Sequence, residues 1–433
     1  MNSDVKKSEV SSADERSMKR VILSCVAGSS LEWYDFALYG YFAAILGRLF
    51  FPSGDAFQQL IASFGAFASG LLARPIGAIL FGYIGDKFGR KKSLLISIYL
   101  MAVPTAAMAL LPTYETLGIW SGVLLTIIRI LQGLALGGGF TGTIVFLYEH
   151  SDEHKRGTYS SWAPFSLVFG FVLGSLMATL MATILSDADL ESWGWRIPFG
   201  ISFVGTFVAK YVQKKLQDPK AFVEMQQKEQ PEKEGKSLLH SLFKNHWKAV
   251  CLVVWIDILT ACGYFLLSVF FPTYFDEILD FDRDISFRVI SVNMIMFSLI
   301  ILFGGWLSDK INRRKQMLIA SLALAAFAYP LFSLFKSGPM LAMVGHLGLI
   351  FLFSIYYGPI PAAICSIFPM KSRLLGVSIA HNFAMAAFGA YAPTVATYLV
   401  KQTGDLAMPA VLFVISASVT ALGLYVWTEN KTY

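Results

Sequence analysis

Residues 82–92 read GYIGDKFGRKK, and residues 305–314 read GWLSDKINRR. Both stretches follow one pattern: Gly, three variable residues, Asp-Lys, one variable residue, Gly or Asn, and two basic residues. This pattern is typical of a helix end at a membrane surface, where Gly or Asn turns the chain and the basic residues face the cytoplasm. The two copies, here called the first and second repeated loops, lie about half a chain apart and predict two similar halves.

Apolar stretches long enough to cross a membrane recur on both sides of these loops. Of the 433 residues, 55% are hydrophobic and 15% are charged, and the mean hydropathy is +0.58. Soluble domains carry about 25% charged residues, and a membrane-spanning helix needs about 20 apolar residues. We therefore expect an all-α membrane protein with about twelve spans, at 21–48, 58–84, 93–111, 116–147, 158–184, 195–213, 249–274, 287–308, 316–335, 339–368, 373–400 and 406–427.

One long polar stretch interrupts the interior of the chain, near residues 214–246. It contains KKLQDPK and KEQPEKEGK and suits a cytoplasmic connector with some amphipathic helix. It divides the spans into six and six. The expected domains are a cytoplasmic tail (1–20), a six-helix bundle (21–213), a cytoplasmic linker (214–246), a second six-helix bundle (247–428) and a short cytoplasmic tail (429–433).

The distribution of basic residues predicts the orientation in the membrane. Of the 35 Lys and Arg residues, 27 fall on the side that holds both repeated loops and the linker, and six fall on the other side. The positive-inside rule therefore places both termini in the cytoplasm. The net charge of +6 comes from this loop bias, so no nucleic-acid partner is expected. Residues 1–20 are polar and are not followed by a cleavage site, so we expect no removable signal peptide.

Several other classes of membrane protein lack their motifs in this sequence. It contains no phosphate-binding Gly-rich loop, no HExxH, no GxSxG and no selectivity-filter repeat. The four cysteines have no CxxC spacing. We therefore expect neither an ATP-driven pump, a channel nor an enzyme, and neither catalytic residues nor a metal site.

The repeated loops and four further motifs carry a resemblance to a known family. The further motifs are Glu32-Trp33-Tyr34-Asp35-Phe36, Arg74-Pro75-Ile-Gly77, Arg129-Ile-Leu-Gln132-Gly133 and Gly194-Trp195-Arg196-Ile-Pro198-Phe199. Over residues 20–428 the chain resembles the major facilitator superfamily and, within it, the metabolite:proton symporter family. That family includes bacterial proline/betaine, 2-oxoglutarate, shikimate and citrate transporters. The resemblance implies proton-driven uptake of a small organic solute by alternating access in the inner membrane, with no cofactor and with the lipid bilayer and protons as partners. We expect a monomer.

Two positions depart from the family pattern. The family usually has Gly-Gly-Glu-aromatic in the fourth helix, whereas this chain has Gly137-Gly138-Gly139-Phe140. The missing glutamate removes one charge from the membrane interior. The second repeated loop has Asn312 where Gly is usual. Because Asn also tolerates the left-handed backbone, we expect this change to matter little.

Ionisable residues inside a membrane are costly and are candidates for function. In the first half, Glu32, Asp35 and Tyr39 have helical spacing and share one face. We expect one of the two carboxylates to take up the proton, with Arg129 as its charge partner. Arg74, Tyr34 and Tyr39 are candidates for substrate binding, and Arg74 or Arg129 could contact a substrate carboxylate. The alternative is a purely structural buried ion pair.

The second half holds fewer charged candidates. Asp257 and Tyr264 share a face of the seventh span, and His381 and Asn382 lie in the eleventh. We expect substrate or proton contacts from these residues, although a lone helical His is often structural. Tyr356 and the following Tyr precede Gly358-Pro359, which predicts a break in the tenth span. Tyr356 could bind a cationic group through its ring face or could simply pack.

The resemblance also implies a role for the repeated loops. In the family such loops help to latch the cytoplasmic ends of the two halves. The corresponding residues here are Gly82, Asp86, Gly89 and Arg90 in the first loop, and Asp309 and Arg313 in the second. Charge pairs that form in only one state supply the differential contacts that alternating access needs.

Two substrate classes remain open within the family. The stretches Ala392-Pro393-Thr394 and residues 406–410 resemble the proline/betaine transporters, and a zwitterion such as proline or glycine betaine is the preferred expectation. Residues 112–120 resemble the 2-oxoglutarate branch, and the two Arg residues inside spans also suit di- or tricarboxylates. An exporter of the same fold is a further alternative, because the sequence does not encode direction.

Overall fold

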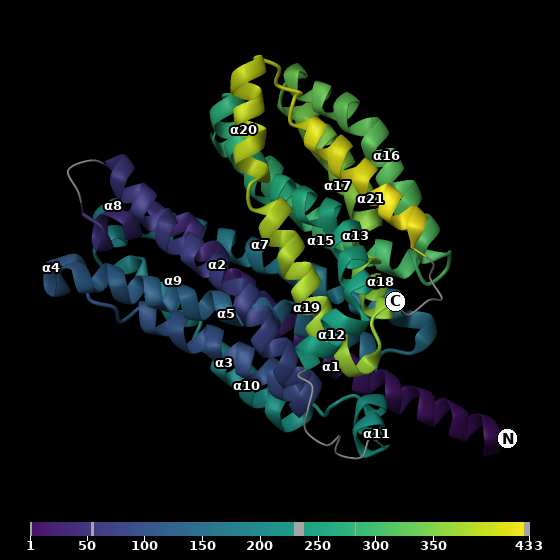
Figure 1. Cartoon of the computed structure of the whole chain (residues 1–433). Helices are drawn as coiled ribbons and strands as arrows, with labels where there is room; N and C mark the ends of the chain where they lie inside the picture. The colour runs from purple at the N-terminus through teal and green to yellow at the C-terminus, as the bar shows by residue number, and fades with distance from the viewer. Residues whose placement is uncertain (1, 53–55, 229–237, 282, 428–433) are drawn as a thin grey trace. The chain divides into compact units, whose positions relative to one another are not determined.

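The computed structural model describes residues 2–52, 56–228, 238–281 and 283–427, and these residues form helices and turns without a strand (Figure 1). The chain divides into two compact units, Met1–Gly235 and Lys236–Tyr433, and each is described by itself. The expected tail 429–433 and residues 229–237 of the expected linker lie outside the described residues.

The first unit contains a helical segment at every predicted span of the first half. Its helices are α1 (Asn2–Phe50), α2 (Ala56–Phe88), α3 (Arg90–Met108), α4 (Tyr114–Leu117), α5 (Ile119–His150), α6 (Arg156–Ser160), α7 (Trp162–Ile184), α8 (Asp187–Asp189), α9 (Arg196–Ile201), α10 (Val204–Lys215) and α11 (Lys220–Lys228). Helix α1 begins at Asn2, so it continues through the segment expected to be a polar tail. Helix α11 lies in the segment expected to be a linker.

The second unit likewise has a helical segment at each predicted span. Its helices are α12 (Leu238–Asn245), α13 (Trp247–Phe265), α14 (Phe271–Thr273), α15 (Arg283–Leu307), α16 (Arg313–Ser333), α17 (Pro339–Tyr357), α18 (Ile360–Ile367), α19 (Arg373–Ala384), α20 (Ala392–Thr403) and α21 (Ala410–Val426). Gly358 and Pro359 separate α17 from α18, which confirms the predicted break in the tenth span.

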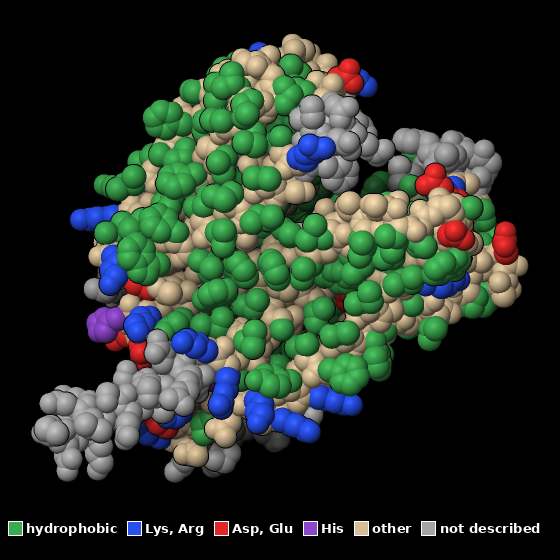
Figure 2. All heavy atoms as spheres, turned by 180° about the vertical axis from the view of Figure 1, so that it is seen from behind, with side chains coloured by type: hydrophobic (Ala, Val, Ile, Leu, Met, Phe, Trp, Pro, Cys, Tyr) green, Lys and Arg blue, Asp and Glu red, His purple; other side chains and the backbone are tan. Residues whose placement is uncertain are grey.

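Length and composition suit these helices to a lipid environment. Among the described residues, eight helices are long and apolar enough to cross a membrane, and α21 is a shorter apolar helix. Many large apolar side chains remain exposed, including Leu72 and Ile76 on α2 at 76% and 64%. Figure 2 shows hydrophobic side chains over much of the drawn face. Such exposure is expected where lipid is the solvent.

Helices α2 and α5 approach each other closely through glycines. A Cβ atom added to Gly133 would collide with the backbone of Gly70, and one added to Gly137 would collide with the backbone carbonyl of Arg74. In the reverse direction, Gly77 lies against the carbonyl of Leu134. The glycine-rich stretch of α5 therefore allows backbone-to-backbone packing.

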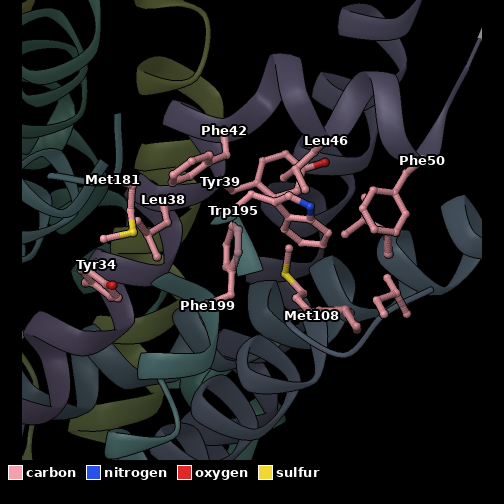
Figure 3. Packing of buried hydrophobic residues seen from close by; sticks show 13 residues of the cluster. Tyr34, Leu38, Tyr39, Phe42, Leu46, Phe50, Met108, Met181, Trp195 and Phe199 are labelled. Carbon is pink, nitrogen blue, oxygen red and sulfur yellow. The ribbon is translucent and has the colours of Figure 1, made fainter. Parts of the chain in front are cut away.

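A buried hydrophobic cluster joins α1 to the short helix α9 (Figure 3). Trp195 meets Phe50 of α1 edge-to-face at 5.6 Å between ring centroids, and it meets Phe199 at 6.1 Å. The Tyr34 hydroxyl donates a hydrogen bond to the carbonyl of Pro198 at 3.1 Å. The aromatic residues of the Gly194–Phe199 motif thus hold α9 against α1.

Candidate transport site

A chain of buried polar side chains runs across the interior of the first unit. Arg129 Nη1 donates to Gln132 Oε1 at 2.6 Å, and Gln132 Nε2 donates to Thr105 Oγ1 at 2.6 Å. Thr105 lies beside Asp35, whose carboxylate accepts a hydrogen bond from Ser202. All five side chains are at most 2% exposed. Residues from α1, α3, α5 and the junction of α9 with α10 therefore meet around one carboxylate.

Arg129 supports Asp35 without a direct ion pair. Among the described residues, no carboxylate lies within ion-pairing distance of its guanidinium, and its Nε atom has no hydrogen-bond partner. The guanidinium instead lies against the ring of Tyr39, 4.2 Å from the centroid. Its charge still acts on Asp35 across the intervening Gln132 and Thr105. Arg129 was predicted as the charge partner of Asp35, and the structure connects it to Asp35 through Gln132 and Thr105.

Glu32 lies in a different environment from Asp35, although both are on α1. Its side chain is 2% exposed, and neither carboxylate oxygen has a partner of normal hydrogen-bond geometry among the described residues. Ser97 of α3 is a polar neighbour. A Cβ atom added to Gly139 would overlap both carboxylate oxygens. The Glu32 carboxyl therefore fills the space that a side chain at position 139 would need, and a glutamate there would displace it.

The other candidates of the first unit, Arg74, Tyr39 and Tyr34, each contact another group of the same unit. The Arg74 guanidinium lies over the ring of Trp33, 5.7 Å from its centroid. The Tyr39 hydroxyl donates to the carbonyl of Ser63 at 2.9 Å. The Tyr34 hydroxyl is engaged at α9, as described above. These hydrogen bonds fix the two tyrosines in place, and substrate contacts by Tyr34, Tyr39 and Arg74 stay predictions.

In the second unit, two separate candidates form a pair. His381 Nδ1 lies 2.6 Å from Asp257 Oδ2, and the side chains are 2% and 0% exposed. The other Asp257 oxygen has no partner among the described residues. The sequence singled out each residue alone, and the fold brings α13 and α19 together so that the two side chains lie within hydrogen-bond distance.

Three further candidates lie on α13, α17 and α19. The Tyr356 hydroxyl donates to the carbonyl of Ile256, next to Asp257 in sequence. Asn382 Nδ2 donates to the carbonyl of Ser378 at 2.9 Å within α19. Tyr264 is buried on α13, at 2% exposure. Their roles in binding stay predictions.

The first repeated loop is a dense ionic cluster. Arg90 Nη1 lies 2.6 Å from both Asp86 Oδ1 and the carbonyl oxygen of Gly85. Arg90 Nε donates to Glu149 Oε2 of α5 at 3.0 Å. Its guanidinium also lies 3.9 Å from the ring centroid of Phe222 on α11. Opposite charges and a ring face therefore surround one buried cation.

The turn in the first repeated loop depends on glycine. Gly89 has φ +109°, where L side chains are strained, and Gly82 is buried within α2. Asp218, which precedes α11, accepts a hydrogen bond from the backbone nitrogen of Lys91 at 2.7 Å. A Cβ atom on Gly89 would lie 2.6 Å from Asp218 Oδ2. The start of α3 is thus capped by a residue from the segment that was expected to be a linker.

The second repeated loop turns without the left-handed backbone that Asn312 could have adopted. Asn312 has φ −59°, so it does not take a left-handed backbone in place of glycine. Its side chain instead accepts a hydrogen bond from the backbone nitrogen of Lys315 at 2.9 Å and caps α16. Arg313 Nη2 lies 3.6 Å from Asp309 Oδ1, beyond hydrogen-bond distance.

Sequence reasoning missed several of the residues that complete these sites. Thr105, Ser202, Glu149 and Phe222 reach the clusters from helices that are distant in sequence. Gln132 carried a usable signal, because its spacing from Arg129 places both on one face of a helix. Among the described residues, no group of three His, Cys, Asp or Glu side chains is placed to hold a metal ion.

Comparisons with known proteins agree with this architecture. The family described as Sugar (and other) transporter matches residues 21–212, and the Major Facilitator Superfamily matches residues 258–432. The Proline/betaine transporter of Salmonella typhimurium is 33% identical over 94% of this chain and 83% of its own length. The Glycine betaine/proline/ectoine/pipecolic acid transporter OusA of Dickeya dadantii is 32% identical over 98% and 86%.

Solved structures show the same fold at lower identity. A double Trp mutant of XylE has a TM-score of 0.77 at 18% identity and covers 96% of this chain and 97% of its own. The proton:xylose symporter XylE with a bound bromodeoxyglucose has a TM-score of 0.69 at 18% identity, over 95% and 96%.

These findings define a membrane transporter of the major facilitator superfamily, with the twelve-helix fold of that class and not an enzyme. Within the superfamily, the chain belongs to the metabolite:proton symporter family, together with the proline/betaine transporters. Both assignments confirm what the motifs predict.

Proposed function

We propose that this transporter takes up a small zwitterion, proline or glycine betaine, together with protons by alternating access. The names of its relatives support this substrate class, since they are proline/betaine transporters and a transporter of betaine, proline, ectoine and pipecolic acid. A di- or tricarboxylate such as 2-oxoglutarate is the second candidate, favoured by the buried guanidinium groups of Arg74 and Arg129. Export by the same fold is the third.

The observation that carries the proton coupling is the enclosure of Asp35. Its carboxylate is 1% exposed, accepts a hydrogen bond from Ser202 and senses the charge of Arg129 through Gln132 and Thr105. A displacement of Arg129 along this chain would change how strongly the site favours the charged form of Asp35. Asp35 is therefore the proposed proton carrier, and Glu32 is the second carboxyl of the site.

The pair in the second unit is proposed to take part in substrate or proton binding. Asp257 and His381 are both buried, so a change in the protonation of either group alters the charge of an enclosed site. Tyr264, Tyr356 and Asn382 are proposed to line the same region. The pairs Asp86–Arg90 and Asp309–Arg313 are proposed as conformational latches that are made in one state and broken in another.

The remaining features of the proposal concern the cell and the assembly. The transporter is proposed to lie in the inner membrane with both termini in the cytoplasm, as the loop charges predict. It is proposed to act as a monomer, without a cofactor and without a nucleic-acid partner. Its domains are proposed to be two six-helix bundles, 21–213 and 247–428, joined by residues 214–246.

Uptake into proteoliposomes tests the proposed function. Radiolabelled proline, glycine betaine and 2-oxoglutarate are offered with and without an imposed proton gradient. We expect accumulation of the two zwitterions only while the gradient is present. Accumulation that persists after the gradient is collapsed would exclude proton symport, and accumulation of 2-oxoglutarate alone would exclude the zwitterion.

The variant Asp35→Asn tests the proton carrier. It is expected to abolish accumulation but to retain exchange of labelled for unlabelled substrate, because a permanently neutral side chain can carry no proton. Glu32→Gln serves as the matched carboxyl variant, and loss of accumulation in it with normal accumulation in Asp35→Asn would make Glu32 the proton carrier. Normal accumulation by Asp35→Asn would remove Asp35 from the proton pathway.

A further inference from the structure

Three aromatic rings of the first unit surround the guanidinium of Arg129. Its Cζ atom lies 4.2 Å from the ring centroid of Tyr39, 4.9 Å from that of Phe67 and 5.6 Å from that of Phe36. All three distances are within about 6 Å, the range in which a ring face attracts a cation. We refer to Phe36, Tyr39 and Phe67 as the aromatic cup.

The cup is a packed structure that does not depend on Arg129 alone. Phe67 of α2 contacts Phe36 at 4.5 Å and Tyr39 at 5.6 Å between ring centroids, and both partners come from α1. The hydrogen bond from the Tyr39 hydroxyl to the Ser63 carbonyl holds that ring in orientation. The hydroxyl is thus directed to α2, while the ring face is left for the cation. Phe67 is half-buried and forms the rim.

Apart from these rings, Arg129 is weakly held. Gln132 accepts the single hydrogen bond that its guanidinium makes to a described side chain, and Nε has no partner in the described part of the chain. A guanidinium can make five donor contacts and binds carboxylates through two of them at once. Most of the donor capacity of Arg129 is therefore unused within the first unit.

We propose that the aromatic cup is the binding site for the positively charged nitrogen of the substrate, and that Arg129 occupies it until the substrate arrives. On binding, the substrate cation replaces the guanidinium against Phe36, Tyr39 and Phe67. The released guanidinium binds the substrate carboxylate through its unused donors. This inference rests on the proposed transport of a zwitterion and assigns the two ends of that substrate to named groups.

The chemistry of an N-methylated ammonium suits such a site. A quaternary nitrogen has no N–H group, so hydrogen-bond acceptors cannot recognise it, whereas ring faces attract it through their quadrupoles. The exchange replaces one cation by another against the rings and forms one charge-assisted pair. The same displacement of Arg129 alters the field at Asp35, which links substrate binding to the proposed proton carrier.

The test compares glycine betaine with tert-butylacetate, which has the same shape and carboxylate but carries an uncharged carbon in place of the nitrogen. Both compounds compete with radiolabelled proline in proteoliposomes. We expect the wild type to prefer betaine and Phe67→Leu to reduce the ratio of the two affinities by about tenfold, since the bound cation then has one ring face fewer. Arg129 loses the same ring face in the empty site, so the change should appear mainly as tighter binding of tert-butylacetate, which cannot replace the guanidinium against the rings.

Two control variants keep the test decisive. Phe64→Leu changes an exposed ring one helical turn away on α2 (47% exposed) and should change neither affinity. Phe67→Tyr retains a ring face and should keep the preference for betaine. The cup is refuted if Phe67→Leu leaves the ratio of the two affinities unchanged. Failure of the wild type to transport either zwitterion would instead refute the proposed function, so the two failures are distinguishable.

Discussion

The two repeated loops have nearly the same sequence pattern but are held very differently. In the first loop, Arg90 is bound by Asp86, by Glu149 of α5 and by the ring of Phe222, and its side chain is 1% exposed. In the second loop, Arg313 has one acidic neighbour among the described residues, at 3.6 Å, and its side chain is 13% exposed. The motif supplies one charge pair in each half, and the partners from other helices decide how firmly that pair is held.

The difference extends to the turn itself. Helix α3 begins directly after Gly89, at a backbone conformation that suits glycine, and Asp218 caps it from outside the loop. Helix α16 begins after Asn312, which supplies its own cap. The helix cap in the first loop therefore comes from the segment before α11, while the cap in the second loop is local. The second loop is held to α21 through Arg314, which donates to the carbonyls of Leu424 and Tyr425. We expect substitutions in the first loop to have larger effects.

The largest effect is expected from Arg90→Ala. It leaves the carboxylates of Asp86 and Glu149, both 0% exposed, without their shared cation, which should cost about 3–5 kcal/mol of unfolding free energy. The matched change Arg313→Ala should cost about 1 kcal/mol, because its pair with Asp309 is longer and less enclosed. Thermal unfolding in detergent measures both. Equal losses would contradict the proposed difference between the loops.

Gly89→Ala is expected to have the next largest effect. The backbone conformation of Gly89, which is almost restricted to glycine, costs an alanine about 1–3 kcal/mol, and the new methyl group displaces Asp218 from the start of α3. In the second loop, Asn312→Gly should cost only about 0.3 kcal/mol, since glycine is also accepted at a cap position. The midpoint of thermal unfolding again provides the readout. If Asn312→Gly lowers the unfolding midpoint more than Gly89→Ala does, then the side-chain cap of α16 contributes more stability than the contact between the first loop and Asp218.

A smaller effect is expected from Phe222→Leu on α11. Loss of the ring face against Arg90 should cost about 1 kcal/mol and should loosen α11 before the rest of the unit. Hydrogen exchange of the α11 amides, followed by mass spectrometry, should therefore accelerate. Val223→Ala, at a neighbouring position that is 38% exposed, is the control and should leave exchange unchanged. Unchanged exchange in Phe222→Leu would show that the ring does not hold α11.

The smallest effect concerns Asp405, a partly exposed carboxylate of the second unit, at the opposite end of α16 from Arg313. Lys336 Nζ, the backbone nitrogen of Ala407 and the Tyr329 hydroxyl donate hydrogen bonds to Asp405 and lower its pKa to about 2. Because the pKa is lower in the folded chain, this stabilisation is present above about pH 4 and is lost as the pH falls toward about 2.

Asp405→Asn isolates that pH dependence. The variant should unfold at a lower temperature than the wild type at neutral pH. The difference between the two midpoints should shrink as the pH approaches about 2. Unfolding midpoints measured across this range supply the comparison. A difference that does not vary with pH would show that Asp405 acts through packing and not through its charge.

Much of the fold follows from hydropathy, because each span must bury about 20 residues in lipid whatever its neighbours are. The predicted spans therefore coincide with helical segments, and the break at Gly358 and Pro359 is confirmed. Asn312 does not take the left-handed backbone, because a short polar side chain has two uses at a helix start. It tolerates a left-handed backbone, but it also caps, and here capping prevails. The expectation that Asn matters little there stays a prediction.

The candidate site could be predicted only in part. Spacing along one helix placed Glu32 and Asp35 together, because helical geometry is local. Ser202 lies 167 positions from Asp35, and His381 lies 124 positions from Asp257, so these partners depend on how separate helices pack. The aromatic rings around Arg129 could not be predicted either, since aromatic residues are abundant throughout the sequence and none of them stands out.

The glycine contact between α2 and α5 determines which positions of these helices can tolerate substitution. Gly70 and Gly133 leave no space for a methyl group, so nearly every substitution there should abolish a functional protein. Two residues further along α2, Leu72 is 76% exposed and should accept any apolar replacement. A saturation library of α2 should thus alternate between forbidden and freely variable positions, with a period that follows the helix turn.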